Sequence, residues 1–232
     1  MKIVNALIMI AVVVIWFIAL VKVYYRTKGK SHYTNVTKFI VRVAIFGAIS
    51  AILYTVPILK FPVPIFPSFL EFHFDEIPVF IAGFAYGPLA ALAILAIKTI
   101  IKLPLSSTLM VGELSDFVFS CAFILPATFV YKKFRSIKGA LIGMLIGMIS
   151  QIAIAMVVNV YASIPFYMWL FHLDEASLLG WIKVANPKIS NIGWSYAFLA
   201  VLPFNLIKDA VVIIVTFLVY KSVHRYLDKY QN

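Results

Sequence analysis

The sequence predicts an all-α membrane protein, and two observations support this fold class. Of the 232 residues, 63% are hydrophobic and only 12% are charged, and the mean hydropathy is +1.01. Soluble domains contain about 25% charged residues, so this composition is typical of a chain that lies in lipid. The apolar residues also form runs of about 20, the length of helix that crosses a bilayer. We therefore expect several transmembrane helices surrounded by membrane lipid.

The composition excludes several kinds of site. Cys121 is the only cysteine in the sequence, so the chain can form neither an internal disulfide nor a cysteine-based metal site. The sequence has no glycine-rich phosphate loop, which argues against an ATPase. We also predict no metal, no cofactor and no nucleic-acid partner.

The apolar run Ile3–Val23 is predicted to be a membrane helix that is retained. A signal peptide is the alternative, but the run is long and is followed by basic residues instead of a small-residue cleavage site. Residues 1–30 would then form an extra N-terminal transmembrane helix. Residues 31–232 would form the main membrane domain.

The next span, Phe39–Leu59, carries small residues at helical spacing. They form two small-xxx-small pairs: Ala44 with Ala48, and Gly47 with Ala51. Such a stripe lets a second helix approach closely, either from a partner protein or from the same bundle.

The segment Lys60–Asp75 is predicted to be extended, because prolines recur in it. From Leu70 onward, polar and aromatic residues alternate, which is typical of an extended segment with one apolar face. We expect this loop to form a lid over a pocket, with Leu70, Phe72 and Phe74 as its lid residues. The polar residues that alternate with them are Glu71, His73 and Asp75. They are a weak candidate metal site, and a solvated edge is the favoured interpretation.

Two short helices are predicted after this loop. Asp75 is placed to cap a helix over Ile77–Tyr86, and Gly87-Pro88 then breaks the chain before a second helix that ends near Ile101. Lys98 lies near the end of the second helix, and we expect it to snorkel to the membrane interface.

Two longer spans follow, Leu114–Tyr131 and Ala140–Tyr161. Asp116 is predicted in the first turn of the first span, where the helix dipole favours a carboxylate. Asn159 is predicted in the last turn of the second. The segment Ile164–Trp194 is then predicted to be a long external loop with interfacial aromatic residues.

The last span, Ala197–Tyr220, carries the strongest functional signal, because it holds Asn205, Lys208 and Asp209 near its middle. A lysine at that depth is costly unless it faces a protein interior or a wet cavity, so it marks a candidate functional site. Asn205 and Lys208 share a helix face, and Pro203 just before them can loosen the helix. The structural alternative is a packing hydrogen bond from Asn205 and a pair between Lys208 and Asp209.

The positive-inside rule gives a topology for these spans. Basic residues cluster within residues 22–38, 132–138 and 221–229. All three clusters are cytoplasmic if the chain has seven helices with its amino end outside and the two short helices count as separate passes. Asn159 and the Asn205–Lys208 pair can then meet beneath the external loops. Two amides and one ammonium suit a planar heterocycle with imide-like edges.

Three stretches resemble a known family. They are Leu202-Pro-Phe-Asn205-Leu-Ile-Lys208, the segment Asn159-Val-Tyr…Pro165, and Phe72-His-Phe-Asp75-Glu-Ile-Pro78…Gly87-Pro88. Together they resemble the riboflavin-specific S component of bacterial energy-coupling factor (ECF) transporters, from about Val41 to Tyr226.

This resemblance implies a six-helix subunit of the bacterial cell membrane, to which residues 1–30 add one helix. It implies binding and uptake of riboflavin, with delivery through an ECF module of one membrane coupling subunit and two cytoplasmic ATPases. Asn159, Asn205 and Lys208 match residues that contact the flavin ring, and the first loop would cover that ring. Ala44 and Ala48 match the pair that docks on the coupling subunit.

Other functions remain as alternatives. Asp116 stands where we expect an asparagine in relatives, so a phosphorylated flavin or another vitamin is an alternative ligand. A membrane-embedded enzyme is a less favoured alternative, and no nucleophile–base pair at suitable spacing supports it, so we predict that the chain is not an enzyme. Its candidate acid–base groups would be Glu71, His73 and Asp75, or Glu113 and Asp116. A structural subunit without a ligand is the third alternative.

Overall fold

The structure, a computed structural model, describes residue 18 and residues 36–62, 65–67 and 70–229. The predicted helix over Ile3–Val23 therefore lies almost wholly outside the described residues, and so does the boundary near residue 30. Within the described residues, five helical segments are long and apolar enough to cross a membrane. They are Val36–Thr55, Pro88–Leu105, Val111–Lys133, Ile137–Leu170 and Trp194–Ser222. These segments confirm an all-α membrane protein, while the count of six helices plus one stays a prediction.

The first part of the described chain follows the predicted order closely. Helix α2 (Val36–Thr55) packs against α4 (Pro88–Lys102), and the short α3 (Glu76–Tyr86) packs against both. Gly87 separates α3 from α4 with a φ of 92°, a left-handed conformation that glycine adopts without strain. Pro88 then starts α4, where its missing N–H costs nothing.

In the described residues of the proline-rich segment between α2 and α3, two short strands are extended, as predicted, and turns and bends make up much of the rest. The single-turn 3₁₀ helix Pro57–Leu59 precedes this segment, and a second one, Leu103–Leu105, follows α4. Within the segment, β1 (Phe61–Pro62) and β2 (Glu71–Phe72) form an antiparallel pair in which Phe61 lies opposite Phe72.

Helices α5 (Val111–Lys133) and α6 (Ile137–Val158) form an antiparallel pair with a very close approach. A Cβ atom at Gly147 would lie only 2.0 Å from the carbonyl oxygen of Phe123, so only glycine fits at this crossing. Ser136 caps α6 by accepting a 3.0 Å hydrogen bond from the N–H of Gly139.

The segment predicted as a long external loop is mostly helical, so that prediction is wrong. It contains α7 (Ile164–Leu170), α8 (Glu175–Ala185) and the single turn α9 (Trp194–Tyr196). Buried apolar side chains such as Leu178 and Ile182 on α8 pack against the bundle.

Two wide π-helical turns interrupt the long spans, and a proline follows each. One covers Asn159–Ser163 before Pro165, and the other covers Ala197–Val201 before Pro203, at the start of α10 (Leu202–Lys229). Proline has no N–H, so it cannot bond to the carbonyl four residues earlier. For Pro203 that carbonyl belongs to Leu199, and it accepts a 3.1 Å hydrogen bond from the Asn186 side chain instead. The predicted loosening at Pro203 is confirmed.

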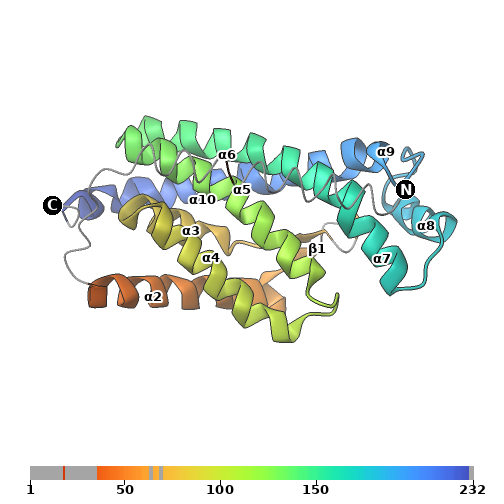
Figure 1. Cartoon of the computed structure of the whole chain (residues 1–232). Helices are drawn as coiled ribbons and strands as arrows, with labels where there is room; N and C mark the ends of the chain where they lie inside the picture. Colours follow the sequence, from red (N-terminus) through yellow and green to blue (C-terminus); the bar gives the residue numbers. More distant parts are fainter. Residues whose placement is uncertain (1–17, 19–35, 63–64, 68–69, 230–232) are drawn as a thin grey trace.

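The two ends of the helix bundle differ in what they contain. The start of α2, the turn between α5 and α6, and the end of α10 lie together at one end (left in Figure 1). Helices α7, α8 and α9 lie at the opposite end. The segments that carry the basic clusters of the described residues thus share one end, as the positive-inside argument requires. Which end faces the cytoplasm stays a prediction.

Candidate ligand-binding site

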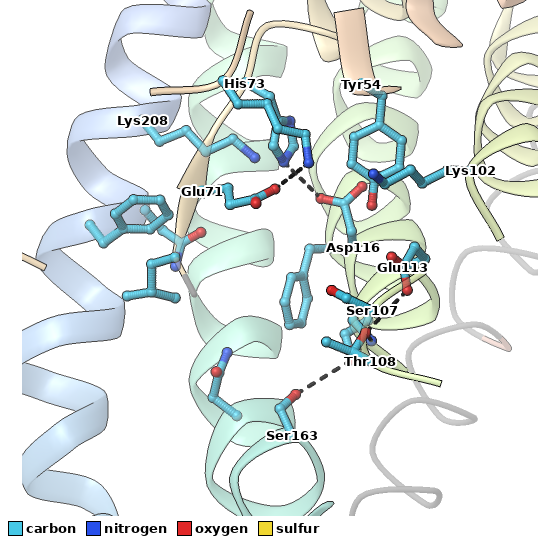
Figure 2. A pocket seen from close by; sticks show the side chains of 18 of the residues that line it. Tyr54, Glu71, His73, Lys102, Ser107, Thr108, Glu113, Asp116, Ser163 and Lys208 are labelled. Carbon is cyan, nitrogen blue, oxygen red and sulfur yellow. Dashed lines mark hydrogen bonds and ion pairs between the residues drawn. The ribbon is translucent and has the colours of Figure 1, made fainter. Parts of the chain in front are cut away.

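A cavity of about 240 Å³ lies between the loop that contains β2, the start of α5, the end of α6 and α10. Asn159, Asn205 and Lys208 all line it, although they come from two different spans. All three side chains are buried in the wall, with 4–6% of each residue exposed. The structure therefore brings together the three predicted site residues (Figure 2 shows Lys208 on the wall of this cavity).

The two asparagine side chains are held in the same way. Asn159 Nδ2 donates to the carbonyl oxygen of Ala155 at 2.9 Å, and Asn205 Nδ2 donates to that of Val201 at 2.8 Å. Each amide is therefore tied to the carbonyl of its own helix four residues earlier.

Lys208 is paired with a residue that the sequence analysis did not single out. Its Nζ lies 3.3 Å from Oε1 of Glu76, in the first turn of α3. The alternative pair between Lys208 and Asp209 does not occur as a salt bridge in the described residues. Adjacent residues on a helix point in different directions, which explains why the partner comes from another helix.

Gln151 is a further member of the site that sequence reasoning missed. It lies in α6, is fully buried, lines the cavity, and donates to Asn205 Oδ1 at 3.1 Å. The signal that could have found it is an amide side chain in the middle of a largely apolar span.

Lys98 does not snorkel to the interface, so that prediction is wrong. The side chain is fully buried and donates to Asp75, to Asp116 at 3.1 Å and to Ser120 at 3.2 Å. Two carboxylates compensate its charge, which makes the buried position tolerable for an ammonium group.

His73 lies between the same two carboxylates. Its Nδ1 contacts Asp75, and its Nε2 lies 3.4 Å from Oδ1 of Asp116, a contact that Figure 2 marks. Burial alone would lower the pKa of His73, but the carboxylates of Asp75 and Asp116 together outweigh burial and raise it to about 9. The imidazole is therefore protonated at neutral pH.

Asp75 does not cap α3 through its side chain, so the predicted cap is wrong. It occupies the N-cap position, but its carboxylate contacts His73 and Lys98 instead. Burial alone would raise the pKa of Asp75, but these two cations lower it below its usual range.

The proposed metal ligands do not converge. Glu71 pairs with Lys60, the residue just before β1, while His73 and Asp75 contact each other. Among the described residues, no group of three or more histidine, cysteine or acidic side chains is arranged to hold a metal ion. His73 and Asp75 are also buried and do not form a solvated edge.

The three predicted lid residues occupy different positions. Leu70 lines the cavity, whereas Phe72 and Phe74 pack into a small aromatic cluster with Phe66 and Phe204. Phe204 itself lines the cavity. The loop is thus anchored to α10 beside Asn205, and its role as a lid stays a prediction.

The wall opposite α10 is rich in acceptors and hydroxyl groups. Glu113 Oε2 accepts from Ser106 at 2.6 Å and from Thr108 at 3.2 Å (Figure 2 shows Thr108 beside Glu113). Asp116 follows on the same helix, beyond its first turn, because α5 already begins at Val111.

The two pairs of small residues on α2 face different surroundings. Gly47 and Ala51 are buried, and a Cβ at Gly47 would lie 3.1 Å from Ile97 of α4. Ala44 and Ala48 are exposed on the outer face of the helix. Only the Ala44–Ala48 pair is therefore accessible to a partner.

Comparison with known proteins gives consistent matches over most of the chain. Residues 38–220 match the family described as ECF transporter, substrate-specific component. The riboflavin transporter FmnP of Bacillus subtilis (strain 168) is 28% identical over 195 residues, which cover 82% of this chain and 96% of the relative. The riboflavin transporter RibU of Staphylococcus aureus (strain TCH60) is 29% identical over 189 residues, covering 81% and 93%. A solved structure of the S component of a bacterial ECF transporter is 25% identical, with a TM-score of 0.62, covering 83% of this chain and 99% of that chain.

Proposed function

This chain belongs to the family of substrate-specific components of ECF transporters, and from that premise we propose that it binds riboflavin in the cavity beside α10. The family consists of transporter components and not of enzymes. The curated relatives that match most of the chain are named riboflavin transporters. The observation that carries the proposal is the convergence of Asn159, Asn205 and Lys208 on one buried cavity.

The chemistry of the cavity suits a flavin. Two amides and an ammonium supply donors and acceptors for the polar edge of the ring, and Phe119 and Phe204 supply apolar surface. The hydroxyl and carboxylate groups of the opposite wall, including Ser107 and Thr108, suit a polyol tail. Leu70, Phe72 and Phe74 belong to the loop that would close over the ligand.

The subunit architecture is also part of the proposal. Residues 31–232 would form the six-helix domain of an S component in the bacterial cell membrane, and residues 1–30 would add one transmembrane helix. Riboflavin would be delivered through an ECF module of one membrane coupling subunit and two cytoplasmic ATPases. The exposed Ala44 and Ala48 would form the contact with the coupling subunit, because small side chains let helix backbones approach closely.

A direct experiment is the absorption spectrum of the purified protein, since co-purified flavin is yellow, followed by titration of riboflavin with flavin fluorescence as the readout. We expect tight, stoichiometric quenching and release of unreacted riboflavin on denaturation. A well-folded protein that neither retains nor binds riboflavin would refute the proposal. A phosphorylated flavin is the second candidate, because Lys60 and Lys102 also line the cavity, and FMN should be titrated in parallel.

A further inference from the structure

Three side chains form a chain from the cavity wall into the protein interior. Asn205 and Gln151 line the cavity, and Asp209 lies behind them with no exposed surface. One end of the Gln151 amide lies 3.1 Å from Asn205 Oδ1. Its other end lies 2.7 Å from Asp209 Oδ2 and 3.0 Å from Oδ1. Both contacts are at hydrogen-bond distance, so each requires one donor and one acceptor.

The hydrogen bond from Asn205 to Val201 fixes the direction of the hydrogen bonds along this series of side chains. Asn205 Nδ2 donates to the carbonyl oxygen of Val201 at 2.8 Å. Turning this amide over would place two oxygen acceptors against each other at that distance. Asn205 Oδ1 therefore points toward Gln151 and accepts from Gln151 Nε2. The oxygen of Gln151 is then the atom that faces Asp209.

An ionised Asp209 cannot satisfy the contact with the Gln151 oxygen, because a carboxylate only accepts hydrogen bonds. With Asp209 ionised, two acceptors would lie 2.7 Å apart. Turning Gln151 over moves the same conflict to Asn205 Oδ1, and a conflict of this kind is costly in a buried site. A proton on Asp209 removes the conflict, because its O–H then donates to Gln151 Oε1.

The charges around Asp209 lead to the same conclusion. The charged groups that act on it are Glu76 on α3, Lys208 on its own helix and His73 on the loop. His73 and Lys98 already compensate Asp75 and Asp116. Of the cations in the described part of the chain that act on this cluster, only Lys208 then remains for the two buried carboxylates of Glu76 and Asp209. Glu76 accepts from Lys208 and from Ser120, which suits an ionised group, so Asp209 is the better holder of the proton.

We infer that Asp209 is a protonated, neutral acid that holds the amide of Asn205, through Gln151, in one orientation toward the ligand. In that orientation Asn205 Oδ1 is occupied by Gln151, and one of the two Nδ2 hydrogens is occupied by Val201. The second hydrogen remains to bind an acceptor on the ligand, such as a ring carbonyl oxygen or a ring nitrogen. Asp209 is thus a positioning residue, and this role rests on the proposed riboflavin function.

Infrared spectroscopy of the full chain, without ligand and at neutral pH, tests the protonation directly. A protonated carboxyl group has a carbonyl stretch that is separate from the bands of carboxylates. We expect this band in the wild type, its loss in Asp209→Asn, and no change in the control Asp174→Asn, whose carboxylate is exposed at the N-cap of α8. In Gln151→Leu the band should remain but shift to higher frequency, because the acid loses its acceptor. A band that disappears in Glu76→Gln but persists in Asp209→Asn would overturn the inference, as would no band at all.

Riboflavin titration then tests the positioning. Asp209→Asn keeps a donor for Gln151 and should bind riboflavin within about threefold of the wild type, while Asp209→Leu should bind about tenfold more weakly. Equal affinity in Asp209→Leu, with an unchanged melting temperature, would refute the positioning role. If the wild type does not bind riboflavin, the proposed function fails, but the infrared band still decides the protonation of Asp209.

Discussion

Replacing Lys208 should affect both ligand binding and stability, and the two effects can be separated. Lys208 lines the cavity, and its Nζ lies 3.3 Å from Oε1 of Glu76. Among the described residues, the other oxygen of Glu76, Oε2, has no hydrogen-bond partner, and the residue is fully buried. Lys208→Met keeps the apolar stem but leaves the Glu76 carboxylate with Ser120 as its remaining donor.

The two magnitudes follow from these contacts. Removing one partner of a buried ion pair costs about 3–5 kcal/mol of stability, because the other charge remains buried and uncompensated. At about 2–4 °C per kcal/mol for a chain of this size, the melting temperature should fall by roughly 10 °C. Losing a hydrogen bond from a charged donor to the ligand should cost about 1.5–3 kcal/mol, or roughly one to two decades in riboflavin affinity.

The double variant Lys208→Met with Glu76→Gln separates the two effects. It removes both charges, so the melting temperature should recover most of the loss, because a neutral pair leaves no uncompensated charge. The riboflavin affinity should stay low if Lys208 contacts the ligand. The measurements are thermal unfolding in detergent and titration of flavin fluorescence, with Glu76→Gln alone as the matched control. Wild-type affinity in the double variant would refute the binding role of Lys208, and unchanged stability in Lys208→Met would refute the ion pair.

Three further predictions concern the partner, the pH dependence and the topology. The double variant Ala44→Leu, Ala48→Leu should bind riboflavin with unchanged affinity but co-purify less with a coupling subunit. The reason is that bulky side chains on this exposed face keep the helix backbones apart. Unchanged assembly and transport would rule out this interface. The pKa of His73 is raised to about 9 from an ordinary value of 6.5, so the stability that it contributes is fully present below about pH 6.5 and is lost as pH rises through 9. The melting temperature should therefore fall across this window in the wild type and remain flatter in His73→Gln; parallel curves would contradict the His73–Asp75 pair. A reporter fused after Lys229 should be cytoplasmic, and external activity of that reporter would reverse the predicted topology.

Features that depend on neighbouring residues were predictable from the sequence. The spans followed from the length of the apolar runs, and the break between α3 and α4 followed from Gly87-Pro88. Asn205 and Lys208 were assigned to one face because residues three apart on a helix always share a face. The weakened helix before them followed from the missing N–H of Pro203. Each of these features depends on spacing or backbone chemistry within a few positions of the chain.

The partners of the buried charges were decided only by the tertiary structure. Lys208 and Glu76 lie 132 positions apart, and Lys98 and Asp75 lie 23 positions apart. From the sequence alone, Lys98 was predicted to snorkel, since a single charge near a helix end usually reaches the interface. Whether a charge stays buried depends on the compensation it finds in other helices, and periodicity within one helix does not contain that information. The sequence by itself therefore determined that Asn205 and Lys208 share one face of α10, while the packing of α3, α4 and α5 determined which charges the buried lysines meet.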